Sequence, residues 1–249
     1  MSKVTLSNTS ALVVLSGGQD STTCLFWAIS QGYKKVAAIS FDYGQRHIRE
    51  LDSAAFVYEL ARRSKPADIE MPDYRIVKRL PSFAGNSPLT NKQKELETYN
   101  SVTEMDAKLQ DRIELTFVPG RNAVFLAAAA GIAVAGGYGA VITGVNGADN
   151  ANYPDCTPSF IEAMEEALQL ATASDIQIIT PLQGLSKGAI CNMATELSGC
   201  LNALAFTTTD YAGEYPPGRN HASVLRASGF KEVGIEDPLI VRARMEGLL

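Results

Sequence analysis

Residues 11–22, ALVVLSGGQDST, run from an apolar segment into a polar turn with two adjacent glycines. The next residues, 23–29, have the composition of a helix. A buried strand that turns into a helix at paired glycines directs several backbone N–H groups at one point, and the helix dipole adds to their positive character. The glycines let the backbone approach an anion, to which the hydroxyls of Ser16, Ser21 and Thr22 can donate. The sequence therefore predicts that the phosphates of a nucleotide bind at residues 16–22.

The spacing of this loop separates it from the loops that bind a transferred terminal phosphate. Those loops read Gly-x-x-x-x-Gly-Lys-Ser/Thr, and no such string occurs in the chain. Kinase-type and GTPase-type chemistry is therefore disfavoured. The alternative interpretation is an ordinary glycine turn in an α/β domain.

Composition favours a globular protein that acts on small molecules. The 249 residues, of which 46% are hydrophobic, suffice for one large α/β domain with or without a small appendage. A net charge of −5 argues against a general affinity for nucleic acid. Four cysteines without metal-type or disulfide-type spacing favour reduced thiols in the cytoplasm, and the apolar run 123–135 is too short to cross a membrane. We expect no leader peptide, no membrane partner and no nucleic-acid partner.

Apolar runs alternate with helix-like stretches along the chain, which predicts a parallel sheet covered on both faces. Strands are expected at 11–15, 35–41, 139–143 and 176–179, and helices at 20–31, 45–63, 121–136, 158–173 and 187–198. Ligands of such sheets bind outside the carboxyl ends of the strands. We predict a nucleotide-binding domain at 1–200 and a C-terminal appendage at 201–249, with short helices near 220–228 and 236–247. The stretch 81–112 lacks a sustained strand or helix signal and is interpreted as a lid or as a solvated surface excursion.

Two further motifs follow expected strands or begin expected helices. The segment 41–47, FDYGQRH, gathers a carboxylate, a phenol, a guanidinium and an imidazole. Alone it is weak evidence, because a lone histidine such as His47 is more often structural than catalytic. The segment 117–122, FVPGRN, places Arg121 at a helix start, where its guanidinium suits bidentate contact with phosphate or carboxylate. A surface arginine is the alternative.

A third group of motifs offers contacts to a planar ring. TGVN at 143–146 is followed by Asp149 and by YPDCTP at 153–158. Asp149 and Asp155 offer acceptors to the N–H edge of a guanine-like ring, and Tyr153 offers a stacking face.

Together, these motifs are similar to those of a known family. The loop resembles the pyrophosphate loop of ATP pyrophosphatases. In chain order, SGGQDSTT (16–23), DYGQRH (42–47), VPGRN (118–122), GVN (144–146), YPDC (153–156) and TPL (180–182) with Lys187 resemble the 7-cyano-7-deazaguanine synthase family. The resemblance covers roughly residues 11–200. It implies a Rossmann-like fold of the adenine-nucleotide α-hydrolase type with a parallel sheet, a homodimer, and conversion of 7-carboxy-7-deazaguanine, ammonia and ATP into the nitrile.

The family's pattern implies roles for particular residues. It implies that the ATP-binding residues are Ser16, Gly17, Gly18, Gln19, Asp20, Ser21, Thr22, Phe41, Gly44, Gln45, Arg46 and Gly144, with Mg²⁺ bridging phosphate oxygens. The substrate-binding residues are Tyr43, Asn122, Asn146, Asp149, Tyr153 and Asp155. The catalytic residues are Asp20, Arg121 and Lys187. Cys156 invites a covalent acyl-enzyme role, but nothing nearby in sequence lowers the pKa of its thiol, so a packing or polar-contact role is preferred.

The C-terminal region departs from the family, whose relatives carry a structural zinc site of four cysteines. No cysteine follows Cys200, and the corresponding positions hold Asp210, Pro217, Asn220 and Ser223. His221 with Asp210 supplies at most two credible donors, so no structural zinc is predicted. Apolar packing is expected to replace the metal, through Leu225, Phe230, Val233, Leu239 and Ile240.

Two other functions remain open at this stage. One is a related acyl-adenylating amide ligase that uses a different acid or amine. The other is a non-catalytic sensor of a nucleotide or deazapurine. Retention of Ser16, Asp20, Ser21, Arg121 and Lys187 together counts against the sensor, since ligand binding alone would not require every one of these groups. Sulfur transfer to tRNA is disfavoured, because paired catalytic cysteines and a basic RNA-binding domain are absent from the sequence.

Overall fold

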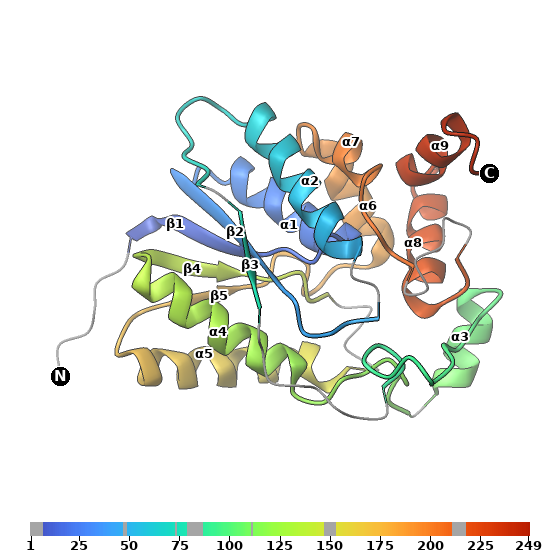
Figure 1. The fold of residues 1–249 in the computed structure, drawn as a ribbon, viewed down its shortest axis with the longest axis horizontal. Helices are drawn as coiled ribbons and strands as arrows, with labels where there is room; N and C mark the ends of the chain where they lie inside the picture. Colours follow the sequence, from blue (N-terminus) through green and yellow to red (C-terminus); the bar gives the residue numbers. More distant parts are fainter. Residues whose placement is uncertain are drawn as a thin grey trace.

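A single parallel sheet organises the chain. The computed structural model describes residues 7–46, 49–72, 74–78, 87–110, 112–146, 153–210 and 218–249. Within them, the sheet has the strand order β3-β2-β1-β4-β5 and only parallel pairs (Figure 1). The strands are β1 (Ser7–Val14), β2 (Lys35–Phe41), β3 (Arg75–Val77), β4 (Tyr138–Ile142) and β5 (Gln177–Ile179). This is the predicted Rossmann-like α/β fold, and the four predicted strands are confirmed.

Helices cover both faces of the sheet, as Figure 1 shows. One face carries α1 (Gln19–Ser30) and α2 (Arg49–Ser64), together with α6 (Lys187–Glu196) and α7 (Cys200–Leu204). The other face carries α4 (Arg121–Ala135) and α5 (Pro158–Thr172). The remaining helices are α3 (Val102–Leu109), α8 (His221–Glu232), α9 (Pro238–Met245) and the short 3₁₀ turn η1 (Pro154–Cys156).

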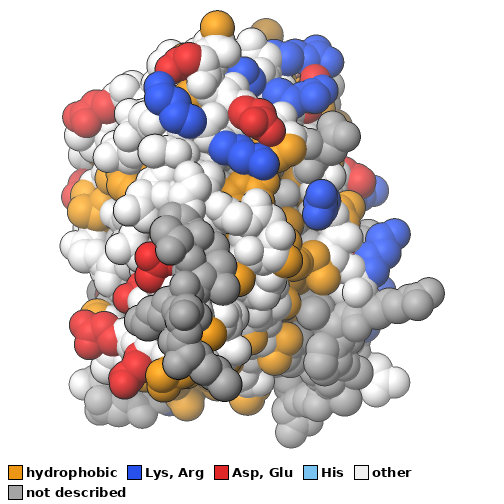
Figure 2. Space-filling model, turned by 90° about the vertical axis from the view of Figure 1, so that its left-hand side faces the viewer, with side chains coloured by type: hydrophobic (Ala, Val, Ile, Leu, Met, Phe, Trp, Pro, Cys, Tyr) orange, Lys and Arg blue, Asp and Glu red, His pale blue; other side chains and the backbone are white. Residues whose placement is uncertain are grey.

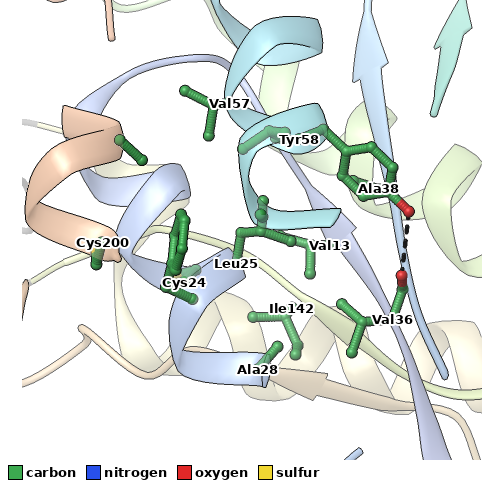
Figure 3. Packing of buried hydrophobic residues seen from close by; sticks show 14 of the residues in the cluster. Val13, Cys24, Leu25, Ala28, Val36, Ala38, Val57, Tyr58, Ile142 and Cys200 are labelled. Carbon is green, nitrogen blue, oxygen red and sulfur yellow. Dashed lines mark hydrogen bonds between the residues drawn. The ribbon is translucent and has the colours of Figure 1, made fainter. Parts of the chain in front are cut away.

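The apolar strands build two cores because neighbouring side chains of a strand point to opposite faces. Val13 packs with α1 and α2, whereas Leu12 packs with α4 and α5. Figure 3 shows the first of these cores, in which Leu25 lies between the strands and α2. At its edge the Tyr58 hydroxyl donates to the carbonyl oxygens of Val36 at 3.2 Å and Pro72 at 2.6 Å. Burial on both faces explains why these strands read as continuous apolar runs.

The order of the strands determines where the site lies. After β1 the chain moves to β2 and β3, then returns across the sheet to β4 on the other side of β1. The chain leaves β1 towards one face of the sheet and leaves β4 towards the other. A crevice therefore opens between the carboxyl ends of these two strands. The loops 15–18 and 143–146 begin there, so the topology brings the two predicted motifs together.

Four elements were not anticipated from the sequence: β3, α3, the short helix α7 and the 3₁₀ turn η1. Strand β3 is short, largely exposed and lies at the edge of the sheet. Helix α3 lies inside 81–112, so the absence of a helix signal there was misjudged. The side chain of Ser101 accepts from the Glu104 N–H at 3.1 Å, and that of Glu104 accepts from the Asn100 N–H at 2.9 Å. The Ser-x-x-Glu spacing at 101–104 is a helix-start signal that the sequence contained.

The C-terminal helices pack on the nucleotide-binding part of the chain. Two helices are found where two were predicted, with α8 against α6 and α3, and α9 against α7. Phe230 belongs to the same core as α1 and α7, and Leu225 packs with Tyr99 beside α3. The expected apolar packing is therefore present. The division at residue 200 stays a prediction.

The face at the amino ends of the strands carries interspersed acidic and basic side chains (Figure 2). Lys34 and Asp68, for example, form an exposed ion pair of 2.6 Å there. The four cysteines are free and buried. Among the residues that the structure describes, no helix has the length and apolar character needed to cross a membrane.

Candidate active site

A cavity of about 280 Å³ lies at the carboxyl ends of the strands, against the first turn of α1. A second, smaller cavity of about 100 Å³ adjoins it. Asp20, Arg121, Cys156 and Lys187 line both cavities. These four side chains therefore stand at the junction where the two cavities meet, and charged and polar groups that converge in this way are typical of ligand-binding pockets.

The loop before α1 forms an anion-binding floor. Gly18 caps α1 without a side-chain acceptor, so the first N–H groups of the helix face the cavity, whose wall includes Gly18, Gln19 and Ser21. The Ser16 and Ser21 hydroxyls lie 3.0 Å apart. Gly17 has φ +85°, a conformation that side chains rarely adopt. The geometry suits a phosphate group held by backbone amides.

Lys187 and Asp20 form a shielded ion pair at the junction. The Lys187 Nζ lies 2.7 Å from the Asp20 Oδ2, with side-chain exposures of 11% and 23%. The Asn146 Nδ2 donates to the same oxygen at 3.1 Å. Asp20 comes from α1 and Lys187 begins α6, so residues 167 positions apart meet at the site. The pair holds the ammonium group at the boundary between the two cavities.

An aromatic wall follows β2. The Phe41 and Phe125 rings stack with centroids 4.5 Å apart, and Tyr43 meets Phe125 edge-on at 5.2 Å. All three line the larger cavity. Gln45 fixes this corner, since its Nε2 donates to the Phe41 carbonyl at 3.1 Å and to Glu50 at 2.9 Å. The wall offers a flat apolar surface to a nucleobase.

Glu50, which the sequence analysis did not select, contributes a buried carboxyl to the cavity wall. Burial raises the pKa of Glu50 from 4.5 to about 7, although the Gln45 hydrogen bond and the Arg121 charge act in the opposite direction. The folded protein therefore holds the Glu50 proton over a pH range in which an unfolded chain has released it.

The raised pKa of Glu50 predicts a pH-dependent effect on stability. Between pH 4.5 and about 7 the unfolded state binds fewer protons at this group than the folded state, so the group's contribution to stability falls as pH rises and levels off above about 7. Glu50→Gln removes this linkage. We expect its melting temperature, relative to the wild type, to increase from pH 4.5 to pH 8 in thermal unfolding followed by circular dichroism. Glu162→Gln, at an exposed position on α5, is the control and should show no such trend. A pH-independent difference for Glu50→Gln contradicts the assignment.

Arg121 and Asn122 begin α4 beside η1. The Asn122 N–H donates to the Asp155 Oδ2 at 3.2 Å, and the Asn122 side chain donates to the Asp155 carbonyl at 3.1 Å. The Cys156 Sγ lies 3.5 Å from the Asn122 Nδ2. Asp155 therefore caps α4 as well as lying near the site, and Cys156 has the polar contact expected of it.

Tyr153 stands in the wall of the smaller cavity. Its hydroxyl lies 2.5 Å from the Thr116 Oγ1, and its ring packs edge-on against Phe117 and His221, with centroids 6.2 Å and 5.8 Å away. The ring is buried, and these contacts fix its orientation at the edge of the smaller cavity.

The structure brings most of the predicted site residues together, though not all of them line a cavity. The cavity walls contain Ser16, Gly18, Gln19, Asp20, Ser21, Phe41, Tyr43, Gln45, Arg46, Arg121, Asn122, Gly144, Tyr153 and Lys187. Five predicted residues lie outside these walls, in the loops and helix ends beside the cavities: Gly17, Thr22, Gly44, Asn146 and Asp155. Asp149 and His47 lie outside the described residues.

Several wall residues were missed because they come from segments without a motif. They are Glu50, Leu89, Phe125, Thr208 and Thr209. Leu89 belongs to the stretch 81–112, and the Arg46 N–H and guanidinium donate to the carbonyls of Leu89 and Lys94, each at 2.8 Å. The described part of this stretch is thus attached to the site. Phe125 follows Arg121 by one helical turn, a spacing that the sequence contained.

The positions corresponding to the family's zinc ligands are joined by hydrogen bonds. The Ser223 Oγ donates to the Asp210 Oδ2 at 3.1 Å, and the Asn220 Oδ1 accepts from the Ser223 N–H at 3.1 Å. Pro217 lies outside the described residues. Among those that are described, no group of three or more His, Cys, Asp or Glu side chains is placed to hold a metal ion.

Comparison with known proteins extends these observations over nearly the whole chain. The 7-cyano-7-deazaguanine synthase of Chromobacterium violaceum is 42% identical over 242 residues, which cover 96% of this chain and 97% of that protein. The enzymes of the same name from Laribacter hongkongensis and Acetivibrio thermocellus are 43% and 40% identical and cover 93% and 92% of this chain, respectively, and 94% and 96% of their own. A solved structure, the U34-tRNA thiolase NcsA from Methanococcus maripaludis, aligns over 100% of this chain and 73% of that chain with 15% identity and a TM-score of 0.42, too distant to inform the site.

The family model described as queuosine biosynthesis protein QueC matches residues 10–234, a range that includes the phosphate loop, the residues lining both cavities and all of α8. The chain belongs to the QueC family.

Proposed function

We propose that this protein converts 7-carboxy-7-deazaguanine and ammonia into 7-cyano-7-deazaguanine at the expense of ATP. The observation that carries the proposal is the pair of adjoining cavities that share Asp20, Arg121 and Lys187. The larger one contains the phosphate loop, and the smaller one contains Tyr153. The activity named for relatives that are 40–43% identical supports the same reaction.

The chemistry explains why one phosphate site suffices. A carboxylate does not lose hydroxide at neutral pH, so its oxygen must first become part of a better leaving group. Attack of the carboxylate on the α-phosphorus of ATP forms an acyl adenylate and releases pyrophosphate. Ammonia then displaces AMP and loses a proton, which leaves the amide. A second ATP activates the amide oxygen in the same way, and loss of AMP and of the last N–H protons forms the nitrile. Two ATP are therefore used for each nitrile.

Residues at the junction and around the two cavities have separate parts in this reaction. The amides at the start of α1 bind the pyrophosphate portion of ATP, and the Phe41–Phe125 wall binds the adenine. Lys187 and Arg121 stabilise the negative charge that develops on the phosphate and on the departing oxygen. Asp20 and Asn146 hold the Lys187 ammonium in place. Tyr153 stacks on the deazapurine, with Asn122 and Asp155 near its polar edge.

The donor set fits Mg²⁺ bound mainly by ATP. The Asp20 carboxylate lies in the cavity wall, and Mg²⁺ at nucleotide sites keeps several waters and takes one or two protein carboxylates together with phosphate oxygens. Asp20 would hold the ion, which reduces the charge on the phosphates when bound. We also propose that the protein is cytoplasmic, forms a homodimer and contains no structural zinc. Light scattering of the purified protein tests the homodimer, and metal analysis tests the absence of zinc.

The proposed reaction is tested by incubating the protein with 7-carboxy-7-deazaguanine, ammonium, ATP and Mg²⁺ and following products by mass spectrometry. We expect the nitrile, with the amide as a transient species. Amide as the only product would show that the reaction stops at the amide and would contradict nitrile formation. Unchanged acid, in the presence of tight ATP binding, supports a sensor or a different acid and contradicts the proposal.

A further inference from the structure

Arg226 on α8 is buried, with 3% of its surface exposed, and all five N–H donors of its guanidinium are used. The Nε and Nη2 groups each donate to the Asp237 carboxylate at 2.7 Å. The Nη2 group also donates to the Leu204 carbonyl at 3.0 Å. The Nη1 group donates to the Thr207 and Thr209 hydroxyls at 2.6 Å and 2.7 Å. The guanidinium thus joins α8, the start of α9 and the segment after α7.

The segment 207–210 that Arg226 holds also contacts the phosphate loop. The Thr208 N–H donates to the Gly17 carbonyl at 2.9 Å, and the Thr208 hydroxyl lies 2.6 Å from the Ser53 hydroxyl on α2. Thr208, Thr209 and Asp210 line the larger cavity. The segment is neither helix nor strand, so these contacts and those to Arg226 determine its path.

We propose that Arg226 is a positioning residue of the nucleotide site, which holds the segment 207–210 against the phosphate loop as a second wall of the cavity. This proposal rests on the proposed function in one respect, namely that the ligand of the larger cavity is ATP. Arg226 itself stands outside the walls of both cavities, so it acts through Thr207 and Thr209. The helices α8 and α9, which Figure 1 places beyond the carboxyl ends of the strands, thereby contribute to nucleotide binding.

The geometry of a guanidinium explains why this position requires arginine. A planar fork binds the Asp237 carboxylate with two parallel hydrogen bonds and still presents Nη1 to two hydroxyls on its other side. A lysine ammonium has three donors at one point and cannot reach all of these acceptors. The hydrogen bonds of Arg226 thus act as a clamp on the segment 207–210. Without this clamp the segment would become ordered only when the nucleotide binds, and the entropic cost of that ordering would weaken nucleotide binding.

Two conservative variants test the clamp in the full-length protein. Arg226→Lys keeps the charge beside Asp237, and Thr207→Val keeps the shape of a buried side chain that lies outside the cavity walls. Binding of α,β-methylene ATP is measured by calorimetry well below the melting temperature. We expect Kd to rise about tenfold for Arg226→Lys and about threefold for Thr207→Val, since one hydrogen bond to a charged group contributes roughly this much or more. The kcat at saturating ATP should stay within about threefold, because the junction residues are intact.

A variant that lowers stability elsewhere separates positioning from a merely structural role. Tyr58→Phe removes the hydroxyl that contacts the Val36 and Pro72 carbonyls, on the β2 side of the first core and away from the cavity walls. It should lower the melting temperature without changing Kd for the ATP analogue. Wild-type Kd values for both Arg226→Lys and Thr207→Val would overturn the proposal. A wild-type protein that binds the analogue but forms no nitrile would contradict the proposed function and leave the clamp in place.

Discussion

Replacement of Lys187 by methionine should lower kcat/KM about 10²–10³-fold, the range found when one preorganised electrostatic group is removed from an active site. Lys187 lies 2.7 Å from Asp20 and lines both cavities, so its charge reaches the phosphate of ATP and the substrate oxygen alike. Methionine keeps the length of the side chain but leaves the Asp20 carboxylate without its cation, which adds repulsion towards the phosphates. Initial rates of AMP release at several ATP and acid concentrations measure the effect.

Lys92→Met is the matched control for this prediction. Lys92 is exposed and lines neither cavity, so the same substitution there should leave kcat/KM unchanged. Because charge stabilisation at the transition state is lost in Lys187→Met, kcat should fall along with kcat/KM. A fall in melting temperature accompanied by a wild-type kcat would show that Lys187 has a structural role only.

Replacement of Gly17 by alanine should abolish measurable nucleotide binding. A Cβ at Gly17 would lie 2.2 Å from the Glu50 carbonyl oxygen and 2.8 Å from the Ala54 nitrogen, both of them backbone atoms of α2. The φ of +85° adds strain of about 1–3 kcal/mol for a residue with a side chain. The loop or α2 must therefore move, and the amides at the start of α1 lose their common direction. Calorimetry with α,β-methylene ATP and thermal unfolding measure binding and stability.

Gly131→Ala provides the comparison, because a Cβ at this position on α4 meets no atom within 4 Å. In a helix interior this change should be neutral or stabilise by about 0.5–1 kcal/mol, with ATP-analogue binding unchanged. If Gly17→Ala binds the analogue as tightly as the wild type does, the phosphate-loop assignment is wrong.

The sequence was most informative where hydrophobic pattern and function coincide. Strands β2 and β4 and the second half of β1 are buried on both faces, so they read as apolar runs that stop at polar turns. The site motifs begin at those stops, because parallel strands place their carboxyl ends along one edge of the sheet. This pattern predicted the loop 16–22 as the phosphate site, whereas Lys187 was assigned to the same site through the family resemblance; the Lys187 Nζ lies 2.7 Å from the Asp20 Oδ2 of that loop.

The remaining elements depend on packing that leaves little trace in the sequence. Strand β3 has three residues and no apolar run, since it lies at the edge of the sheet. No motif marks the segment 207–210, yet Thr208 and Thr209 line the larger cavity, and Arg226 holds the segment through Thr207 and Thr209. The C-terminal region was expected to rely on apolar packing. It also contains the buried Arg226–Asp237 ion pair, which becomes visible only when α8 and α9 are placed side by side.

The direct test of adenylation uses 7-carboxy-7-deazaguanine labelled with ¹⁸O in both carboxylate oxygens. Activation through an acyl adenylate and then an adenylated amide transfers each oxygen to the phosphate of a departing AMP. We predict two molecules of AMP, each with one ¹⁸O, for every nitrile formed, as measured by mass spectrometry. Unlabelled AMP, or ¹⁸O in inorganic phosphate accompanied by ADP, would contradict activation of the acid at this nucleotide site.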